Sequence, residues 1–395
     1  MPRTRSGEQA DHEASKDSAT PRRWKRWRRF LGVVVALGLI SASVIVFIAS
    51  RAPGTDPLAV KVAVWGRSHG LGFAITAYER VAYAVHPPKV GGTATISVTP
   101  RPTPATSEPT KQPLAPIPPV VPGTPIANEG QWQSVVSKAG QPVVNVAYLR
   151  PDSEHTSYLT AVMRLDHSRI RLQLHPGYED PGDITRFGVP DRIVRTQWPT
   201  LVAAFNGGFK ISDARGGFYL NGVTAGKLRP GAASLVTYRD GRVNVGAWGE
   251  DISMSSDIES VRQNLRLLVD DGKVTKSANS AVRSSWGGTL GGAYFVWRTG
   301  IGIRADGDIV FAVGDSLSAR TLAGVLKAAG AVRAMQLDIN PDWAAGFWFS
   351  EPPASSTSRR PVAHKVLDFK KPLYRWFTAT SRDFYSVHLR EPNTP

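Results

Sequence analysis

The spacing of apolar residues predicts one long helix near the start of the chain and a strand-rich region in its second half. The 21 residues of Phe30–Ser50 carry no charge, and a helix of that length spans about 30 Å, the thickness of the hydrocarbon core of a bilayer. Further along, Ala293–Ile303 and Asp308–Val313 are apolar runs, and Asp306-Gly307 between them is a turn signal of the hairpin kind. The pattern therefore predicts a membrane-length helix followed by β-hairpins.

A helix and a third strand should follow this hairpin. Ser318 is a suitable N-cap, and Gly330 is placed to end the helix. One face of the helix is apolar and consists of Leu322, Val325, Leu326 and Ala329. Ala331–Leu337 then predicts a buried strand that ends at Asp338, while Arg298 lies on the first strand of the hairpin. We expect neighbouring strands to bring this cation and this carboxylate to the rim of one pocket.

The rest of the second half is also dominated by predicted strands. These are Pro142–Leu149, Leu159–Leu165, Ile170–Leu174, Thr200–Phe205, Ser234–Tyr238, Arg242–Trp248 and Phe384–Leu389. Ser256 and Glu259 form a capping box, which predicts one more helix. Its apolar face would hold Ile258, Val261, Leu265 and Leu268. Mixed hairpins with few helices indicate an α+β fold, with mixed β-sheets in one domain over residues 128–395.

The apolar N-terminal helix also predicts where the chain resides. Directly before it, Arg22–Arg29 is dense in cations, which stay on the cytoplasmic side. We therefore expect residues 1–29 to be a basic cytoplasmic tail, residues 30–50 a single-pass signal-anchor in the cell membrane, and the C-terminal domain to be extracytoplasmic. A cleaved signal peptide is the alternative. The anchor is favoured because the apolar run exceeds a typical signal sequence and no clear small-residue cleavage site precedes Arg51.

Two segments separate this anchor from the domain. In the juxtamembrane residues 51–86, Leu58–Trp65 alternates between apolar and other residues. Helical spacing follows at Ile75, Tyr78, Ala82 and Val85. This segment is too short to form its own core, so we expect it to lie on the membrane or to dock on a neighbour. Residues 87–127 predict a disordered proline-rich linker, because Pro100–Pro125 holds ten prolines in 26 residues. Such a stalk reaches roughly 120 Å at most.

Charge and cysteine content narrow the classes of function. The net charge is +16, but residues 1–29 alone hold nine Lys and Arg against four Asp and Glu. The remaining excess is spread along the chain without clusters, so no nucleic-acid partner is expected. The chain contains no cysteine, which excludes disulfides, thiolate metal sites and cysteine nucleophiles.

Gly314–Leu317 reads Gly-Asp-Ser-Leu and looks like the nucleophile block of GDSL esterases. That chemistry needs a histidine base after the serine. Here the Asp-x-x-His pair, Asp152 and His155, precedes the serine, and only 79 residues follow Ser316. We therefore expect Ser316 and Ser318 to cap the following helix.

Asp338, Asn340 and Asp342 imitate the opening of a calcium loop, with oxygen ligands at alternate positions. Trp343 stands at the sixth position, where an EF-hand requires glycine, and Phe349 stands at the twelfth, where a bidentate glutamate belongs. An EF-hand is excluded. A looser calcium-like site on these three oxygens stays open, but neither a metal nor a cofactor is predicted.

Two further motifs each have a structural and a functional interpretation. Asn206–Phe209 reads Asn-Gly-Gly-Phe at the end of a buried strand. Its glycines permit a tight turn, and they would also let a ligand approach the backbone. Aromatic residues gather after Asp338 at Trp343, Phe347, Trp348 and Phe349. They could fill the core, or their faces could stack on a sugar ring.

In combination these blocks resemble the phosphodiester glycosidase family. The matching segments are Asn206–Phe209, the Arg-Thr-x-x-Gly strand Arg298–Gly302, the predicted helix Thr321–Gly330, and Gln336–Asp338, which ends in Leu-Asp. Their order and spacing are more specific than any one block. The family usually continues with Gly-Gly-Gly-Ser, whereas this chain has the stiffer, proline-containing Ile339–Trp343. We expect this loop to alter substrate choice.

The resemblance implies chemistry in which a phosphate ester leaves the sugar. Such a leaving group is a weak base, so a strong general acid matters less than in ordinary glycosidases. Arg298 would hold the phosphate, helped by Arg304, Arg215 or Lys210. Asp338 would stabilise the developing oxocarbenium ion or activate water; the alternative is a structural salt bridge from Asp338 to Arg298.

Asn206 completes the catalytic set that the resemblance implies, and Asp342 is the reserve carboxylate. The expected substrate-binding residues are Gly207, Gly208, Phe209, Thr299, Asn340, Asp342 and Trp343. The predicted function is a membrane-anchored, extracytoplasmic hydrolase that cleaves glycosyl phosphodiester bonds in cell-envelope or exopolysaccharide glycans. The alternative is a non-catalytic module that binds anionic cell-wall polymer.

Overall fold

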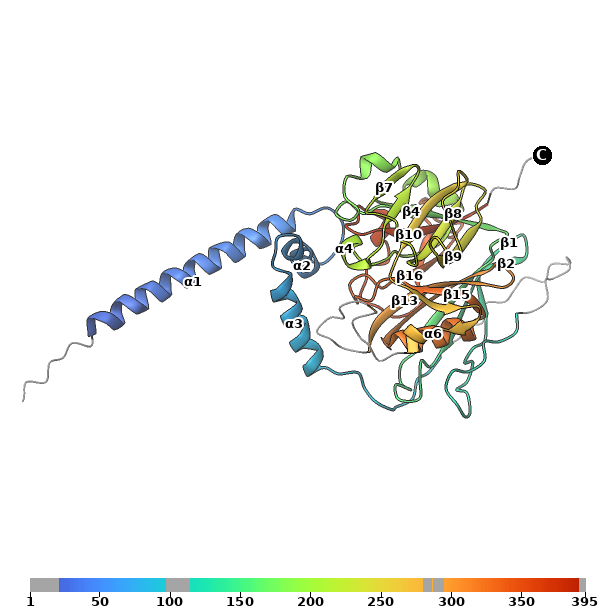
Figure 1. Cartoon of the computed structure of the whole chain (residues 1–395), viewed down its shortest axis with the longest axis horizontal. Helices are drawn as coiled ribbons and strands as arrows, with labels where there is room; N and C mark the ends of the chain where they lie inside the picture. The colour runs from blue at the N-terminus through green and yellow to red at the C-terminus, as the bar shows by residue number, and fades with distance from the viewer. Residues whose placement is uncertain (1–20, 97–113, 280–285, 287–294, 391–395) are drawn as a thin grey trace, which may run out of the picture. The chain divides into compact units, whose positions relative to one another are not determined.

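The computed structural model describes residues 21–96, 114–279, 286 and 295–390 (Figure 1). The chain divides into two compact units, residues 1–52 and 53–395. In the first unit, α1 (Pro21–Ser50) is a continuous helix, and its segment Arg26–Ser50 is long and apolar enough to cross a membrane. The predicted apolar helix is thus confirmed. It can serve as a signal anchor or a membrane span.

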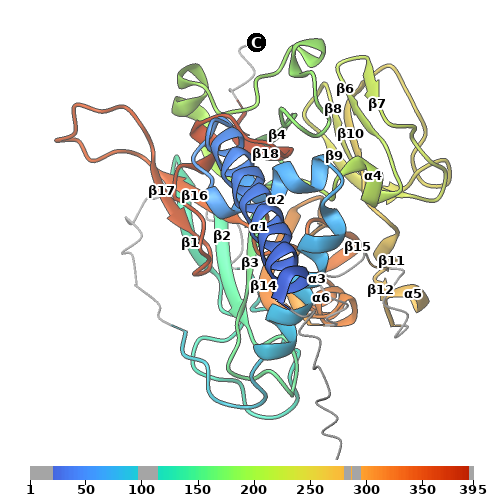
Figure 2. The same ribbon diagram turned by 90° about the vertical axis from the view of Figure 1, so that its left-hand side faces the viewer.

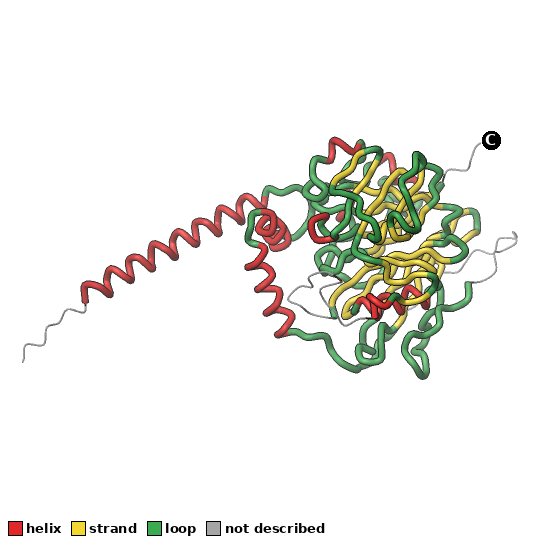
Figure 3. Tube along the Cα trace, in the orientation of Figure 1, coloured by secondary structure: helices red, strands yellow, loops and turns green. Residues whose placement is uncertain are grey.

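The second unit is built mainly of strands (Figure 3). Its largest sheet has eight strands, all in antiparallel pairs. In spatial order they are β1 (Gln133–Lys138), β2 (Gln141–Leu149), β3 (Thr160–Leu165), β14 (Ile309–Leu317), β13 (Val296–Arg304), β15 (Ala331–Gln336), β11 (Leu267–Asp270) and β12 (Lys273–Val274).

Two five-stranded antiparallel sheets complete the unit. The second sheet, grouped at the upper right of Figure 2, has the order β7 (Val223–Ala225), β6 (Phe218–Leu220), β10 (Ile258–Gln263), β8 (Ala233–Tyr238) and β9 (Val243–Ala247). The third has the order β17 (Val362–Lys365), β16 (Gly346–Ser350), β5 (Leu201–Asn206), β18 (Phe384–Leu389) and β4 (Ile170–His175).

The helices of the second unit are few and mostly short. The α-helices are α2 (Leu58–Ser68), α3 (Gly72–Val85), α4 (Ile211–Ala214), α5 (Lys276–Asn279) and α6 (Ala319–Ala328). The 3₁₀ turns are η1 (Ile184–Phe187), η2 (Arg195–Thr200) and η5 (Arg375–Phe377). Mixed antiparallel sheets with few helices confirm the predicted α+β class.

The predicted hairpin, helix and third strand are present as β13, β14, α6 and β15. Ser318 caps α6, because the Thr321 backbone N–H donates to Ser318 Oγ at 3.0 Å. The helix lies close to the sheet, since a Cβ built on Gly300 would come within 2.9 Å of Leu326. Thr299 lies on β13, which pairs with β15. We call β13, α6 and β15 the frame, because these three elements support the loop after Leu337.

The helix predicted from Ser256 and Glu259 is wrong. Ile258–Gln263 is instead β10, a strand between β6 and β8. A local capping signal is worth only about 1 kcal/mol, whereas β10 exchanges ladder hydrogen bonds on both sides and adds a Thr237–Ser260 side-chain bond of 2.6 Å. Tertiary pairing therefore overrides the local preference.

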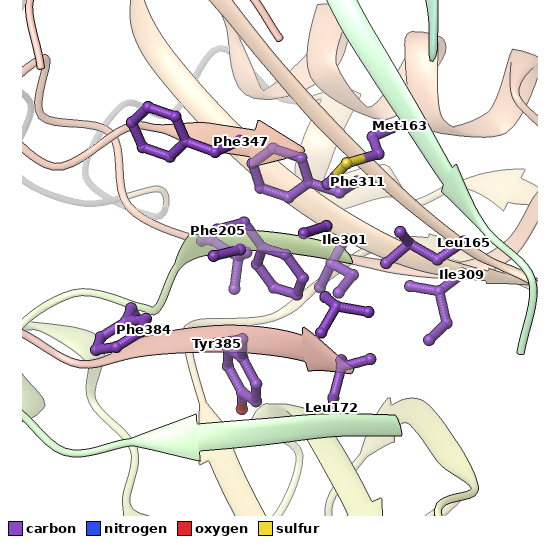
Figure 4. Packing of buried hydrophobic residues seen from close by; sticks show 14 of the residues in the cluster. Met163, Leu165, Leu172, Phe205, Ile301, Ile309, Phe311, Phe347, Phe384 and Tyr385 are labelled. Carbon is purple, nitrogen blue, oxygen red and sulfur yellow. The ribbon is translucent and has the colours of Figure 1, made fainter. Parts of the chain in front are cut away.

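The main core holds the first and third sheets together (Figure 4). Phe205 of β5 stacks on Phe311 of β14, with ring centroids 4.9 Å apart, and on Tyr385 of β18 at 5.4 Å. Phe347 and Phe349 also belong to this core. Of the four aromatic residues after Asp338, Trp343 instead packs outside it.

The juxtamembrane segment forms two helices. The residues predicted at helical spacing lie on α3, and Leu58–Trp65, which alternates in sequence, lies on α2. Val60 and Val64 of α2 pack against Trp343. The neighbour on which α2 docks is therefore the protein's own domain.

Part of the predicted proline-rich linker, residues 97–113, lies outside the described residues. The stretch that follows packs on the domain: Ile117 is buried in the cluster beneath α6, and its N–H donates to Gly130 O at 2.9 Å. Contacts with the folded region thus begin before residue 128.

Candidate active site

Asp338 sits where the frame of β13, α6 and β15 ends. Its backbone is held by Thr299, whose N–H and Oγ1 donate to Asp338 O at 3.1 and 2.9 Å. Its carboxylate Oδ1 accepts the N–H groups of Ile339 and Asn340 at 2.7 and 3.1 Å. The Arg382 guanidinium lies 3.3 Å from the other oxygen. This buried carboxylate is fixed in place, and one of its oxygens faces a cation.

Asn206, at the end of β5, ties three segments together. Its side-chain N–H groups donate to Thr299 Oγ1 at 2.8 Å and to Gly207 O at 2.9 Å, and its Oδ1 accepts the Ala345 N–H at 3.1 Å. The amide group is occupied by protein partners. Asn206 is therefore placed to position the loop that carries Asp338.

Close packing explains the glycines of the Asn-Gly-Gly-Phe turn. A Cβ on Gly207 would lie 2.0 Å from Asp383 Oδ2, and one on Gly208 would lie 3.1 Å from the Arg262 guanidinium carbon. Arg262 and Asp383 form a fully buried ion pair of 2.7 Å. Phe209 is buried in a small apolar cluster with Ile339.

A small cavity of about 10 Å³ joins these groups. It is lined by Asn206, Gly207, Gly208, Asp338, Trp343, Arg375, Trp376, Arg382 and Asp383. The space holds about one water molecule. Two carboxylates and two guanidinium groups thus meet at one point, beside the turn that the sequence singled out.

The two arginines of the cavity retain hydrogen-bonding capacity. Within the described part of the chain, Nε of Arg375 and Nε of Arg382 are buried and have no hydrogen-bond partner. Each guanidinium carbon lies 5.4 Å from the centre of a Trp343 ring, and Arg382 also donates to Gly208 O at 3.0 Å. Buried guanidinium groups with spare N–H donors suit the oxygens of a phosphate.

Burial dominates the electrostatics of this site. It raises the pKa of Asp338, while the positive charge of Arg382 and hydrogen bonds from the loop backbone oppose that rise. Burial also lowers the pKa of Arg375, against the opposing effect of Asp56 and Asp342. Both groups therefore have shifted pKa values, which are frequent at functional sites.

The structure places Arg298 outside the lining of this cavity. Its guanidinium is buried and donates to Leu317 O and Gln336 Oε1, both at 2.7 Å. The ion pair of Asp338 is with Arg382, not with Arg298. Arg298 lies on β13 and Asp338 follows β15, as predicted. The cation that pairs with Asp338 is nevertheless Arg382, which precedes β18.

The helper cations proposed from sequence are dispersed. Arg304 donates to Ala329 O and pairs with Asp306 at the hairpin turn. Arg215 lies in a left-handed turn after α4. Lys210 is partly buried, and burial and the charge of Arg382 lower its pKa. Of these three cations, Lys210 is the one whose pKa is shifted by Arg382, a residue that lines the cavity.

The loop after Asp338 turns its oxygens toward protein groups. Asn340 Oδ1 accepts the Asp342 N–H at 2.7 Å, and Asp342 lies 3.3 Å from Lys371. Asp338 in turn faces Arg382, so each of the three side chains proposed for a cation has a protein partner. Elsewhere Asp166, His167 and Asp308 cluster closely enough for a metal, but Arg164 is paired with Asp308 there.

Sequence reasoning missed the C-terminal contributors, Arg375, Arg382 and Asp383. No motif marks them, and they lie 37 to 45 residues beyond Asp338. The available signal was the Arg-Asp pair directly before the apolar run Phe384–Leu389, because charges at the start of a buried strand need partners. That strand, β18, lies beside β5 and so delivers them to the Asn-Gly-Gly-Phe turn.

Comparison with known proteins supports the motif-based resemblance. Residues 199–338 match the family model of the phosphodiester glycosidases. Among solved structures, the zebrafish N-acetylglucosamine-1-phosphodiester alpha-N-acetylglucosaminidase catalytic domain, auto-inhibited by pro-peptide, is similar at 16% identity and a TM-score of 0.40, over 66% of this chain and 88% of that chain.

A hypothetical protein from Synechocystis is similar at 10% identity and a TM-score of 0.29, over 62% of this chain and 64% of that chain. No curated protein matches the sequence. The family match covers the Asn-Gly-Gly-Phe turn, the Arg-Thr-x-x-Gly strand and the Leu-Asp end of β15. The predicted resemblance is confirmed to this extent: residues 199–338 match the family model of the phosphodiester glycosidases.

Proposed function

We propose that the domain is a hydrolase that cleaves glycosyl phosphodiester bonds in cell-envelope or exopolysaccharide glycans. One observation carries the proposal: the buried Asp338 carboxylate shares a cavity with Arg375 and Arg382, whose Nε atoms make no hydrogen bond to the described residues. A sugar phosphodiester presents an anionic phosphate next to the carbon that becomes positively charged. The cavity offers groups of the opposite charge for each.

Arg375 and Arg382 are assigned to the phosphate. Two guanidinium groups can hold the phosphodiester through paired N–H bonds, and they stabilise the second negative charge that forms when the phosphate ester leaves. Their positions are fixed by Trp343 and by Gly208 O. Arg298 is assigned a structural role because its donors reach protein acceptors.

Asp338 is assigned to the sugar. As the bond from the anomeric carbon to the phosphate oxygen breaks, the carboxylate stabilises the oxocarbenium ion or takes a proton from the attacking water. Water supplies the new hydroxyl, and the phosphate ester leaves as a stable anion. Arg262 holds Asp383 beside this centre as the second carboxylate.

Access to the cavity requires movement. A space of about 10 Å³ excludes a sugar phosphate. Trp343 lines the cavity, Val60 and Val64 of α2 pack on Trp343, and Asp56 pairs with Arg375 at 3.4 Å. We therefore expect substrate to displace this segment, and Asp56→Asn to raise kcat/KM several-fold because a competing carboxylate is removed. A lower kcat/KM would oppose this assignment.

The second candidate is a non-catalytic module that binds anionic cell-wall polymer. The closed cavity and the proline-containing loop Ile339–Trp343 favour it. The arginines would then bind phosphate groups of the polymer without cleaving them.

Release of free sugar from a synthetic sugar-1-phosphodiester separates the two functions. The hydrolase releases sugar, and Asp338→Asn abolishes the release while circular dichroism stays unchanged. The module binds the compound without turnover, and Asp338→Asn does not alter that binding. Parallel detection of the phosphate monoester identifies the bond that is cleaved.

We also propose that α1 anchors the protein with its basic N-terminus in the cytoplasm and the domain outside, because Arg22–Arg29 precede the apolar segment. Protease added to intact cells should then digest residues after the anchor and spare an N-terminal tag. Protection of the domain would reverse the orientation.

A further inference from the structure

A second, much larger cavity lies in the same unit, with a volume of about 700 Å³. Its wall includes Tyr158, Phe295, Trp297, Asp315, Lys365 and Lys370. That volume falls within the range of small-molecule binding sites, which bury a ligand among aromatic residues and a few polar groups. None of the roles assigned so far uses this cavity.

An irregularity in the main sheet directs Asp315 into the cavity. Along the β13–β14 ladder, Val296 faces Leu317 and Arg298 faces Gly314, so Trp297 stands opposite both Asp315 and Ser316. This two-against-one arrangement is a β-bulge, which re-aims side chains and is common beside active sites. The Gly-Asp-Ser-Leu block therefore forms a bulge at the wall of a cavity.

Ser316 shows that the bulge is strained. It is buried and has φ of 56°, in the left-handed region. A residue other than glycine held there costs of order 1 kcal/mol or more, and such residues cluster at functional sites. His155 pairs with Asp152 at 3.0 Å and makes no hydrogen bond to Ser316 among the described residues. A hydrolytic serine is therefore not the explanation of the strain.

Asp315 is largely buried without a cation. Within residues 114–279 and 295–390, no Lys or Arg forms an ion pair with it, and its Oδ1 accepts the Ser316 N–H at 2.6 Å. Burial raises the pKa of Asp315, and hydrogen bonds from Ser316 and Trp297 oppose the rise. A carboxylate kept in an aromatic wall at this cost has acceptor capacity for a ligand.

The charges of the wall favour a neutral, polyhydroxylated ligand. Asp315, Asp342 and Asp368 would repel an anion, while Lys365 and Lys370 would repel a cation. Hydroxyl groups can donate to the carboxylates and accept from the ammonium groups. The apolar face of a sugar ring can lie on an aromatic ring, which Tyr158, Phe295 and Trp297 supply.

One loop contributes residues both to this cavity and to the proposed reaction site. Pro341 and Asp342 line the cavity, and Asp338 begins the same loop. We propose that this cavity binds a neutral sugar unit of the glycan, on the side of the phosphate away from the cleaved sugar, with Trp297 as its stacking platform and Asp315 as its hydroxyl acceptor. This assignment deepens the proposed function and rests on it for the place of the sugar in the substrate.

Binding is tested without catalysis on the full chain carrying Asp338→Asn. The probes are cellobiose, maltose and N,N′-diacetylchitobiose, followed by saturation-transfer NMR. At least one should receive saturation at its ring C–H protons. Asp315→Asn and Trp297→Phe should each weaken that binding about tenfold or more, as expected when a hydrogen-bonded acceptor or a large stacking face is lost. Asp306→Asn and Lys273→Ala, exposed and remote in the fold, should leave it unchanged.

Absence of transfer to all three disaccharides, or equal binding by the Asp315→Asn variant, would overturn the assignment. Asp315→Asn hardly changes the shape of the side chain, so this variant should fold normally. It therefore tests the assignment even if the Trp297→Phe variant does not fold.

A kinetic arm separates this assignment from the proposed function. With Asp338 intact, Asp315→Asn should raise KM about tenfold for a phosphodiester whose leaving phosphate bears a sugar, and should spare one that bears a methyl group. If neither compound is cleaved but the disaccharide binds, the cavity assignment stands and hydrolysis fails. If both are cleaved and Asp315→Asn affects them equally, hydrolysis stands and the cavity assignment fails.

Discussion

Two buried arginines, Arg298 and Arg382, differ in the hydrogen-bond partners of their guanidinium groups. Arg298 donates to Leu317 O and Gln336 Oε1 on neighbouring strands. Arg382 reaches Asp338 in a cavity, and its Nε keeps no hydrogen-bond partner in the described part of the chain. The difference shows that burial of a cation does not mark a functional site by itself. Our proposal of a site at Arg382 rests instead on spare N–H donors that face a carboxylate across a cavity.

The largest effect should come from the carboxylate on the Arg382 side of this comparison. Asp338→Asn keeps the shape of the side chain but removes its charge, so kcat should fall about 10³-fold. Sugar release from a synthetic phosphodiester measures it. Asp306→Asn, on the exposed hairpin turn, is the matched control and should retain full activity. Wild-type kcat in Asp338→Asn would remove this residue from the mechanism.

Next in size should be the loss of the planar donor groups. Arg382→Lys and Arg375→Lys keep the positive charge but not the fork of N–H donors, so kcat/KM should fall about 10²-fold. The exposed Arg333, paired with Asp251, offers Arg333→Lys as the control. A loss no greater than that of the control would show that the phosphate binds elsewhere.

On the other side of the comparison, Arg298→Met should affect stability rather than catalysis. It leaves Leu317 O and Gln336 Oε1 without their donor, so the free energy of unfolding should fall by about 2–4 kcal/mol. Urea denaturation measures this loss. Activity per folded molecule should stay within about twofold. A large loss of kcat in fully folded protein would instead support the catalytic role predicted for Arg298 from sequence.

An effect that depends on pH should come from a buried histidine pair in the third sheet. Ser386 Oγ lies 2.8 Å from His175 Nε2 and 2.7 Å from His388 Nε2. Burial lowers the pKa of His175 to about 4 and that of His388 to about 3. Both histidines have an ordinary pKa near 6.5, so the unfolded chain binds more protons at acid pH. Their contribution to stability is therefore complete above pH 6.5 and is lost as the pH falls toward 4 and 3.

Between pH 6 and pH 4.5 each histidine should cost up to about 1.4 kcal/mol of unfolding free energy per pH unit. Urea denaturation at several pH values measures the slope, and His388→Gln should make it shallower. A stability that rises on acidification would show that these histidines are protonated in the folded protein.

The frame of the site could be predicted from sequence, because its signals are local. Apolar periodicity gave β13, α6 and β15, Ser318 capped α6, and Asp338 followed the last strand as expected. The cations could not be assigned, since nothing local distinguishes Arg298, which lies outside the cavity lining, from Arg382, which lines the cavity and pairs there with Asp338. That distinction depends on the β5–β18 pairing between residues about 180 positions apart.

The same limit explains the other differences. Ser256 and Glu259 have the pattern of a helix start, but β10 lies between two strands whose pairing no local pattern reveals. Likewise, Gly314–Leu317 reads as a motif of catalysis or capping. Only the register of β13 against β14 shows that it forms a bulge with Asp315 facing a cavity.

The most direct test of the account is a crystal structure of the Asp338→Asn variant with an intact sugar phosphodiester. The account predicts phosphate oxygens within hydrogen-bond distance of Arg375 and Arg382, the anomeric carbon beside residue 338, and α2 displaced from Trp343. A phosphate bound instead by Arg298, or one remote from residue 338, would contradict it.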